Sequence, residues 1–464
     1  MPQNPSSPAP SLLRQIASLA GPIFVANLAI VLTGTLDTVM VGHLSAEQLA
    51  GVALGATVIN WILVSFAGVI QGLSPIAGYL FGAKDYPKIG QSLVQGLWLG
   101  LPLSVLAVFL GSRTAFWLEL AGMTGPAAGV ARDYIHAALA SIPAVIFARS
   151  FVAVNSAVSM PVITMGVMLA SVALKIPLNL HFIYGGLGLP AMGGAGAGLA
   201  SSVSCSFSLA AYALVWLLHP RFARMRAGAR AGLRPAVLAR LLRLGVPIGL
   251  SSFFEMSSYT LMAIFIARLG VEALSAHQIV ANLVWLYYVL PLAVGVAGSV
   301  LVAQSLGEGK PARAREAAWL GVCFSLGCAL VIAALTWSFR AEIAAFYTSD
   351  TAIRGVTVAF LAWVPLYHVM DSLQCSCSNI LRGYQVTFLP MAVSSLLLCG
   401  VGLALGCVFS GVFPGTGFNA GAVAFWQGAD AALVLAAAAM LALLRHFSRA
   451  ALEKPAGAFG LKKP

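Results

Sequence analysis

The chain consists largely of apolar stretches long enough to cross a lipid bilayer as helices. A crossing needs about 20 apolar residues. Twelve such stretches follow one another, at 19–42, 51–76, 91–112, 133–154, 162–184, 194–218, 243–267, 277–302, 316–338, 354–378, 387–410 and 418–444. Their unbroken character indicates helices, because the strands of a membrane barrel alternate polar and apolar residues. The sequence therefore predicts an all-α integral membrane protein with twelve transmembrane helices.

Composition and charge support the membrane assignment. Of the 464 residues, 60% are hydrophobic and 9% are charged, which leaves too few polar side chains to cover a soluble globule of this size. The net charge is +12, and 20 of the 26 Lys and Arg residues fall on the inner side if the N-terminus is cytoplasmic. We therefore expect a multi-pass membrane protein with both termini cytoplasmic. Its basic residues would meet the lipid bilayer, with no nucleic acid as a partner.

A basic segment without acidic residues, 219–242, divides the chain into two halves. A shift of 225 positions pairs Pro22 with Pro247, Glu47 with Glu272 and Gly82 with Gly307. The shared order of features predicts an N-lobe at 12–218 and a C-lobe at 243–444, six helices each. A pseudo-two-fold axis along the membrane normal would relate them, with a cavity between. Residues 1–11 are expected to be a disordered cytoplasmic tail, and 445–464 a second cytoplasmic tail.

Three carboxylates, Asp37, Glu255 and Asp371, lie inside the apolar stretches. Placing one ionised carboxylate at the bilayer centre costs roughly 2.5 to 3.5 kcal/mol, so intramembrane acids usually face a bundle interior or water and serve a function. A buried carboxylate favours its neutral form unless a cation compensates it, which leaves a proton, a metal cation or a cationic substrate as its partner. The alternative is a carboxyl group that a neighbouring helix satisfies.

Two further embedded charges have ambiguous roles. Asp430 lies in a run rich in small residues, where a protonated or helix-bonded carboxyl is as reasonable as a functional one. Lys175 is the only embedded lysine, and it would either pair with an acid or extend toward the headgroups. The seven cysteines all lie within predicted helices and give neither a disulfide framework nor zinc-ligand spacing.

Aromatic residues near the acids are candidates for binding an organic cation through their ring faces. They include Phe24, Tyr259 and Tyr367. Tyr367 precedes Asp371 by four residues, so the two side chains share one helix face. Packing against lipid or neighbouring helices is the alternative interpretation of these rings.

Several segments resemble the multidrug and toxic compound extrusion (MATE) transporters, in particular their NorM-type bacterial branch. In family order they are GTLDTVMVGHLSAEQLAGVALG, GAKDYPKIGQ, LGVPIGLSSFFEMSSYTLMAIFIARLGVEALSAHQIVANL, QSLGEGKPARARE and NILRGYQVTFLPM. The resemblance implies two six-helix lobes and a central cavity that opens alternately to each side. It also implies export of cationic hydrophobic drugs or dyes in exchange for Na+ or H+, without a cofactor and by a monomer.

The resemblance also implies roles for the embedded residues. Glu255 and Asp371 would form the cation-coupling site of the C-lobe and hold Na+ if that is the coupling ion. Asp37 would serve cation coupling in the N-lobe or bind the drug, together with Tyr367, Phe24 and Tyr259. The DinF-like branch has an Asp at the position of Asn179 and an Asn at that of Lys175, which favours the NorM-like reading here.

Two other functions fit less well. A lipid-linked saccharide or lipid flippase of the same superfamily would carry cationic residues to meet phosphate, whereas the embedded charges here are mostly acids. An intramembrane aspartyl protease would need a Gly-x-Gly-Asp context that these acids lack. The sequence therefore predicts a transporter and not an enzyme.

Overall fold

The structure is a computed structural model that describes residues 11–186, 188–229, 232–413 and 420–453. In these residues helices make up the fold, and the β pairing is a single isolated bridge. The helices of the first half are α1 (Leu12–Gly42), α2 (Ala46–Ile70), α3 (Leu73–Gly82), α4 (Tyr86–Ser112), α5 (Thr114–Leu120), α6 (Pro126–Ala138), α7 (Ser141–Ala157), α8 (Pro161–Tyr184) and α9 (Gly194–Leu218). Two short helices follow, η1 (Pro220–Phe222) and α10 (Ala223–Arg226).

The second half repeats this pattern. Its helices are α11 (Pro235–Ala267), α12 (Val271–Gly307), α13 (Pro311–Ser338), α14 (Arg340–Tyr347), α15 (Thr351–Leu361), α16 (Val364–Gly383), α17 (Phe388–Ser395), the π-helix η2 (Leu396–Gly402), α18 (Leu403–Ser410) and α19 (Val423–Glu453). Among the described residues, ten helical segments are long and apolar enough to cross a membrane. Two bent pairs, α6 with α7 and α15 with α16, raise the number to twelve. The predicted all-α membrane fold is confirmed.

Helix ends differ from the predicted membrane boundaries where basic residues flank a span. α11 begins at Pro235, inside the segment 219–242 that the sequence suggested as a loop, and α19 continues to Glu453, beyond residue 444. Hydropathy marks where lipid contact begins, whereas a helix continues into water as long as its backbone hydrogen bonds persist. Proline at the first turn also suits a helix start, because its missing N–H would have no partner there. The predicted tail at 1–11 lies almost entirely outside the described residues.

Local sequence signals place several helix starts. The Ser45 hydroxyl accepts a hydrogen bond from the Gln48 amide at 3.1 Å and caps α2. Asp85 caps α4 in the same way. Between α11 and α12, Gly270 has a φ of 122°, a conformation that side-chain-bearing residues rarely adopt. These turns are short, so the helices they join pack side by side.

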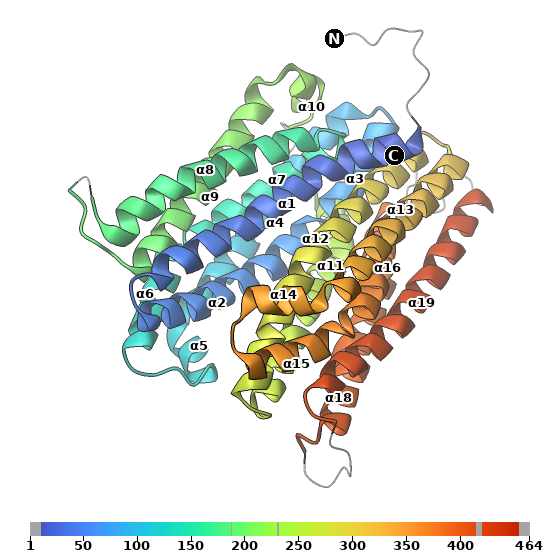
Figure 1. The fold of residues 1–464 in the computed structure, drawn as a ribbon. Coiled ribbons are helices and arrows are strands. Elements are labelled where there is room, and N and C mark those ends of the chain that lie inside the picture. The colour runs from blue at the N-terminus through green and yellow to red at the C-terminus, as the bar shows by residue number, and fades with distance from the viewer. Residues whose placement is uncertain (1–10, 187, 230–231, 414–419, 454–464) are drawn as a thin grey trace.

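The helices assemble into two lobes, α1 to α9 and α11 to α19, which follow the colour change from blue and green to yellow and red in Figure 1. Ile62 and Ile142 belong to the buried core of the N-lobe. The first half of α1 departs from this division, because Ile16 packs in one cluster with Ala297 and Leu444 of the C-lobe. α1 therefore contributes to both lobes and lines their interface.

The lobes meet most closely at the end of the molecule that carries the start of α1 and the end of α19, which we call the inner end. A methyl group added to Gly82 of α3 would overlap the backbone carbonyl of Gln304 in α12. A methyl group on Gly307 would overlap the carbonyl of Tyr79. Tyr79 and Gln304 are 225 positions apart, as are Gly82 and Gly307. The contact is thus made twice by equivalent residues, as a pseudo-two-fold axis between the lobes requires.

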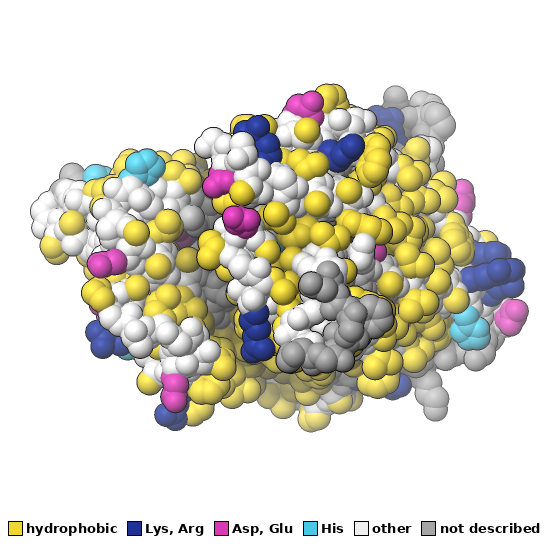
Figure 2. All heavy atoms as spheres, turned by 60° about the horizontal axis from the view of Figure 1, so that its bottom comes forward, with side chains coloured by type: hydrophobic (Ala, Val, Ile, Leu, Met, Phe, Trp, Pro, Cys, Tyr) yellow, Lys and Arg dark blue, Asp and Glu magenta, His cyan; other side chains and the backbone are white. Residues whose placement is uncertain are grey.

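Polar contacts reinforce the inner end. The Gln304 side chain donates to the Ala157 carbonyl at 2.7 Å, and Arg313 donates to Gln15 at 3.1 Å. Figure 2 looks toward the opposite end, where the surface is hollowed between the two lobes. The structure is therefore closed between the lobes at the inner end.

Candidate functional site

Two of the predicted acids come together inside the C-lobe. Glu255 is half-buried on α11, and Asp371 on α16 is 5% exposed. The two carboxyl groups are close enough for their charges to interact, and the Tyr288 hydroxyl of α12 contacts Glu255. The C-lobe therefore holds two acids, on different helices, that lie within range of each other's charge.

Two tyrosines join the helices that carry this carboxyl pair. The hydroxyl groups of Tyr259 and Tyr367 are hydrogen-bonded to each other. Tyr259 follows Glu255 by four residues on α11, and Tyr367 precedes Asp371 by four on α16, so each tyrosine lies one turn from an acid on the same helix face. The Tyr367 ring also meets Trp426 of α19 edge-on, with 5.5 Å between ring centroids. Oxygen atoms and aromatic faces are thus grouped around two acids.

The site also contains a cationic side chain that the sequence analysis did not predict there. Arg382 lies on α16 and interacts electrostatically with Glu255. Its guanidinium also donates to Gln71, the residue that follows α2, at 3.5 Å, across the lobe interface. From the sequence, Arg382 is one of the 20 basic residues expected on the inner side, because it follows the apolar stretch 354–378. One sequence signal could have placed Arg382 in the site, because it follows Asp371 by only about three helical turns.

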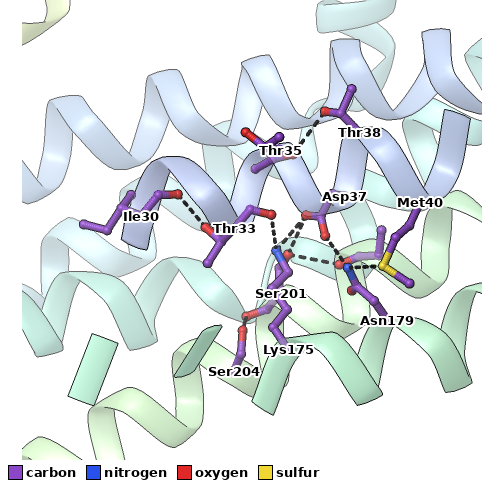
Figure 3. A network of polar contacts seen from close by, with 12 residues as sticks. Ile30, Thr33, Thr35, Asp37, Thr38, Met40, Lys175, Asn179, Ser201 and Ser204 are labelled. Carbon is purple, nitrogen blue, oxygen red and sulfur yellow. Dashed lines mark hydrogen bonds and ion pairs between the residues drawn. The ribbon is translucent and has the colours of Figure 1, made fainter. Parts of the chain in front are cut away.

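The third predicted acid, Asp37, lies in the N-lobe, away from the other two. Figure 3 shows its carboxylate between α1, α8 and α9. The Lys175 ammonium lies 2.7 Å from Asp37 Oδ2, and the Asn179 amide donates to Oδ1 at 2.8 Å. Ser201 donates to Oδ2 at 3.3 Å. The sequence left open whether Lys175 pairs with an acid or extends toward the headgroups, and in the structure it pairs with Asp37.

The elements around Asp37 explain this pairing. Lys175 and Asn179 are four residues apart on α8, so both face α1. Lys175 also donates to the Thr33 backbone carbonyl at 3.2 Å. Asp37 and Lys175 are 4% and 3% exposed, so the ion pair is shielded from solvent.

Two other residues named from the sequence lie outside both acid sites. Phe24 is half-buried on the first half of α1, where it packs against the cluster that joins α1 to the C-lobe. Asp430 of α19 is 3% exposed, and neither of its carboxyl oxygens has a hydrogen-bond partner among the described residues. Within the same residues, no group of three or more His, Cys, Asp or Glu side chains is arranged to hold a metal ion. Any cation held here would be bound by few carboxylates and by neutral oxygens.

The comparison with known protein families decides the family. The MatE family model matches residues 22–181 and 247–417. The chain belongs to the MatE family. Its two matched segments begin 225 positions apart, at the two prolines that the internal repeat pairs. The prediction of a MATE-type protein is confirmed.

Relatives and solved structures agree with this assignment. The chain is 36% identical to a probable multidrug resistance protein NorM of Aromatoleum aromaticum, over 93% of each chain. It is 32% identical to a NorM protein of Neisseria meningitidis serogroup B, over 94% of this chain and 95% of the relative. Its fold matches a eukaryotic MATE transporter, AtDTX14, with a TM-score of 0.84 at 19% identity, covering 95% and 98% of the two chains. A MOP superfamily transporter from Pyrococcus furiosus gives 0.86 at 20% identity, covering 96% and 98%. The chain is a multi-pass membrane transporter by family.

Proposed function

We propose that this protein exports cationic hydrophobic drugs or dyes across the bacterial inner membrane in exchange for Na+ or H+, with Glu255 and Asp371 as the coupling site. The observation that carries the proposal is the hydrogen bond between Tyr259 and Tyr367, each one helical turn from an acid, with the two acids within range of each other's charge. Two acids in a low-dielectric site need a proton or a cation to compensate their charge. The names of the NorM relatives support multidrug resistance as the biological role.

The chemistry of the site suits exchange of one cation for another. Carboxylate and hydroxyl oxygens are ligands that hard cations such as Na+ prefer, and the rings of Tyr259 and Tyr367 offer faces to an organic cation. A drug cation and the coupling ion would therefore compete for the same negative charge. Separation of the contacts at the inner end would then open the cavity to the cytoplasm, in the rocking motion that duplicated transporters use.

The location and assembly belong to the same proposal. The basic helix α10 between the lobes and the basic end of α19 both lie at the inner end, which we propose faces the cytoplasm together with both termini. Each chain contains both lobes and so both walls of the cavity. A monomer is therefore the proposed working unit.

The test is drug efflux from cells that lack their own pumps, with Na+ concentration and pH varied independently. Glu255→Gln and Asp371→Asn are expected to remove the dependence of ethidium efflux on the coupling ion and to lower its rate at least about tenfold, equivalent to about 1.4 kcal/mol. Glu272→Gln, at an exposed acid at the start of α12, is the matched control and should transport normally. Wild-type efflux by both C-lobe variants at equal expression would refute the coupling assignment.

The flippase alternative gains no support from the N-lobe. A flippase needs cationic residues to meet a lipid phosphate, and Lys175 is the embedded lysine of the N-lobe. The ammonium of Lys175 is bonded to Asp37 and to the Thr33 carbonyl, so its charge is already compensated inside the protein.

A further inference from the structure

The environment of the Lys175 ammonium resembles a binding site for a small cation. The nearest oxygen is Asp37 Oδ2 at 2.7 Å, followed by the Thr33 carbonyl at 3.2 Å. Ser201 donates to the same carboxylate oxygen, which places a hydroxyl oxygen beside the ammonium. Carboxylate, carbonyl and hydroxyl oxygens are the ligands of hard metal cations. The charged end of Lys175 thus lies among the groups that would otherwise hold such an ion.

A second observation points to a ligand at this place. Asn179 is fully buried, and its amide donates to Asp37 Oδ1 at 2.8 Å. Its side-chain oxygen has no hydrogen-bond partner among the described residues. A buried acceptor without a donor is uncommon in proteins. A cation with free coordination positions would satisfy this oxygen, whereas an ammonium fixed at the end of a lysine chain reaches only some of its neighbours.

We infer that the Lys175 ammonium is a tethered cation that fills a monovalent-cation site in the N-lobe, and that Asp37 is therefore unavailable to an exchanged ion. The inference rests on the proposed function in one respect: if Asp37 cannot bind the exchanged ion, Glu255 and Asp371 remain as the coupling site. Without Lys175, Asp37 would be an uncompensated carboxylate at low dielectric, which favours uptake of a proton or a cation. The carbonyl and hydroxyl oxygens around it are ligands that favour a hard metal cation. Replacing Lys175 with a neutral side chain should therefore create a Na+ site.

The test counts Na+ ions bound to the purified full-length protein with ²²Na+. Lys175→Asn supplies an additional amide oxygen in place of the ammonium and is expected to bind about one more Na+ per chain than the wild type does. The double variant Lys175→Asn/Asp37→Asn should lose this gain. Lys88→Asn is the matched control, because it removes a lysine that pairs with Asp85 at 2.8 Å on the exposed surface, and it should bind no additional ion.

The additional Na+ bound by Lys175→Asn tests the tethered cation, whereas the Na+ bound by the wild type tests the proposed coupling site. If the wild type binds no Na+ but Lys175→Asn gains a site, the tethered cation is supported and Na+ coupling at the C-lobe acids is refuted. If Asp371→Asn binds less Na+ than the wild type, and Lys175→Asn binds no more Na+ than the wild type, the coupling site is supported and the tethered cation is refuted.

A stability measurement covers the case in which Lys175→Asn is poorly folded. Its thermal midpoint is compared in Na+ and in N-methylglucamine, a cation too large for the site. Stabilisation of Lys175→Asn by Na+ beyond that of the wild type supports the inference. Equal instability of the variant in both salts overturns it.

Discussion

At the scale of single residues, Asp371 and Asp430 form a natural comparison. They lie on the contacting helices α16 and α19 and are similarly buried, but only Asp371 has a second acid nearby. Asp430 has no hydrogen-bond partner among the described residues. We therefore expect Asp430→Asn to keep ion-dependent efflux, whereas Asp371→Asn loses it. Parallel efflux assays at matched expression check this, and loss of ion dependence in Asp430→Asn would assign that residue to coupling.

The same contrast predicts a change in stability. A buried polar group without a partner costs about 1 to 3 kcal/mol. Asp430→Leu, which keeps the branched shape without the polar oxygens, is expected to raise the free energy of unfolding by a similar amount. The thermal midpoint of the purified variant in detergent measures this. A lower midpoint would mean that Asp430 has a partner that the replacement removes.

The embedded acids could be found from the sequence because a charge in a long apolar stretch is conspicuous. Their partners could not all be found. Lys175 and Asp37 are 138 positions apart, and whether they meet depends on how α8 is rotated against α1. For Arg382 the limit was different, since a residue after an apolar stretch can lie in water or continue the buried helix.

At the scale of helices, the tight contact at the inner end predicts a conformational effect. A methyl group on Gly307 would overlap the Tyr79 carbonyl, so Gly307→Ala should push α3 and α12 apart. Overpacking of this kind costs about 1 to 3 kcal/mol, enough to lower the ratio of inner-closed to inner-open states roughly 5- to 150-fold. Distances between spin labels on the inner ends of the two lobes measure the shift.

The control for this prediction is another glycine within a helix. Gly327 of α13 has open space where a methyl group would be added, so Gly327→Ala should leave the spin-label distances unchanged. Unchanged distances in Gly307→Ala as well would show that the inner end has room for the added methyl group.

Helix number and order were predictable, because long apolar stretches report membrane crossings directly. The breaks within two of the membrane spans were not predictable. The paired segments α6–α7 and α15–α16 bend by 44° and 46° at breaks of a few residues. Hydropathy is continuous across both breaks, so it shows a single span in each case. The bends recur at similar places in the two halves, which identifies them as a feature of the repeat.

At the scale of the whole molecule, the two lobes differ in how their acids are compensated. In the N-lobe, Lys175 neutralises Asp37 by direct contact. In the C-lobe, Glu255 and Asp371 share a region in which Arg382 is the cation that interacts with Glu255. A duplicated fold thus carries two unequal sites, and the difference arises from a few side chains while the helix arrangement is retained.

The two-fold contact at the inner end also predicts how transport can be stopped. A Cβ atom on Gly78 of α3 would lie 3.1 Å from the Cβ of Ala303 in α12, close to the Cβ separation of about 3.5 to 4.5 Å found in disulfides. Gly78→Cys/Ala303→Cys should therefore form a disulfide between the lobes under oxidising conditions. Because rocking requires the inner ends to separate, efflux into the medium should cease on oxidation and return on reduction. Each single cysteine variant, which cannot form this bridge, should transport under both conditions, and efflux that continues through a fully oxidised double variant would show that the lobes do not part here.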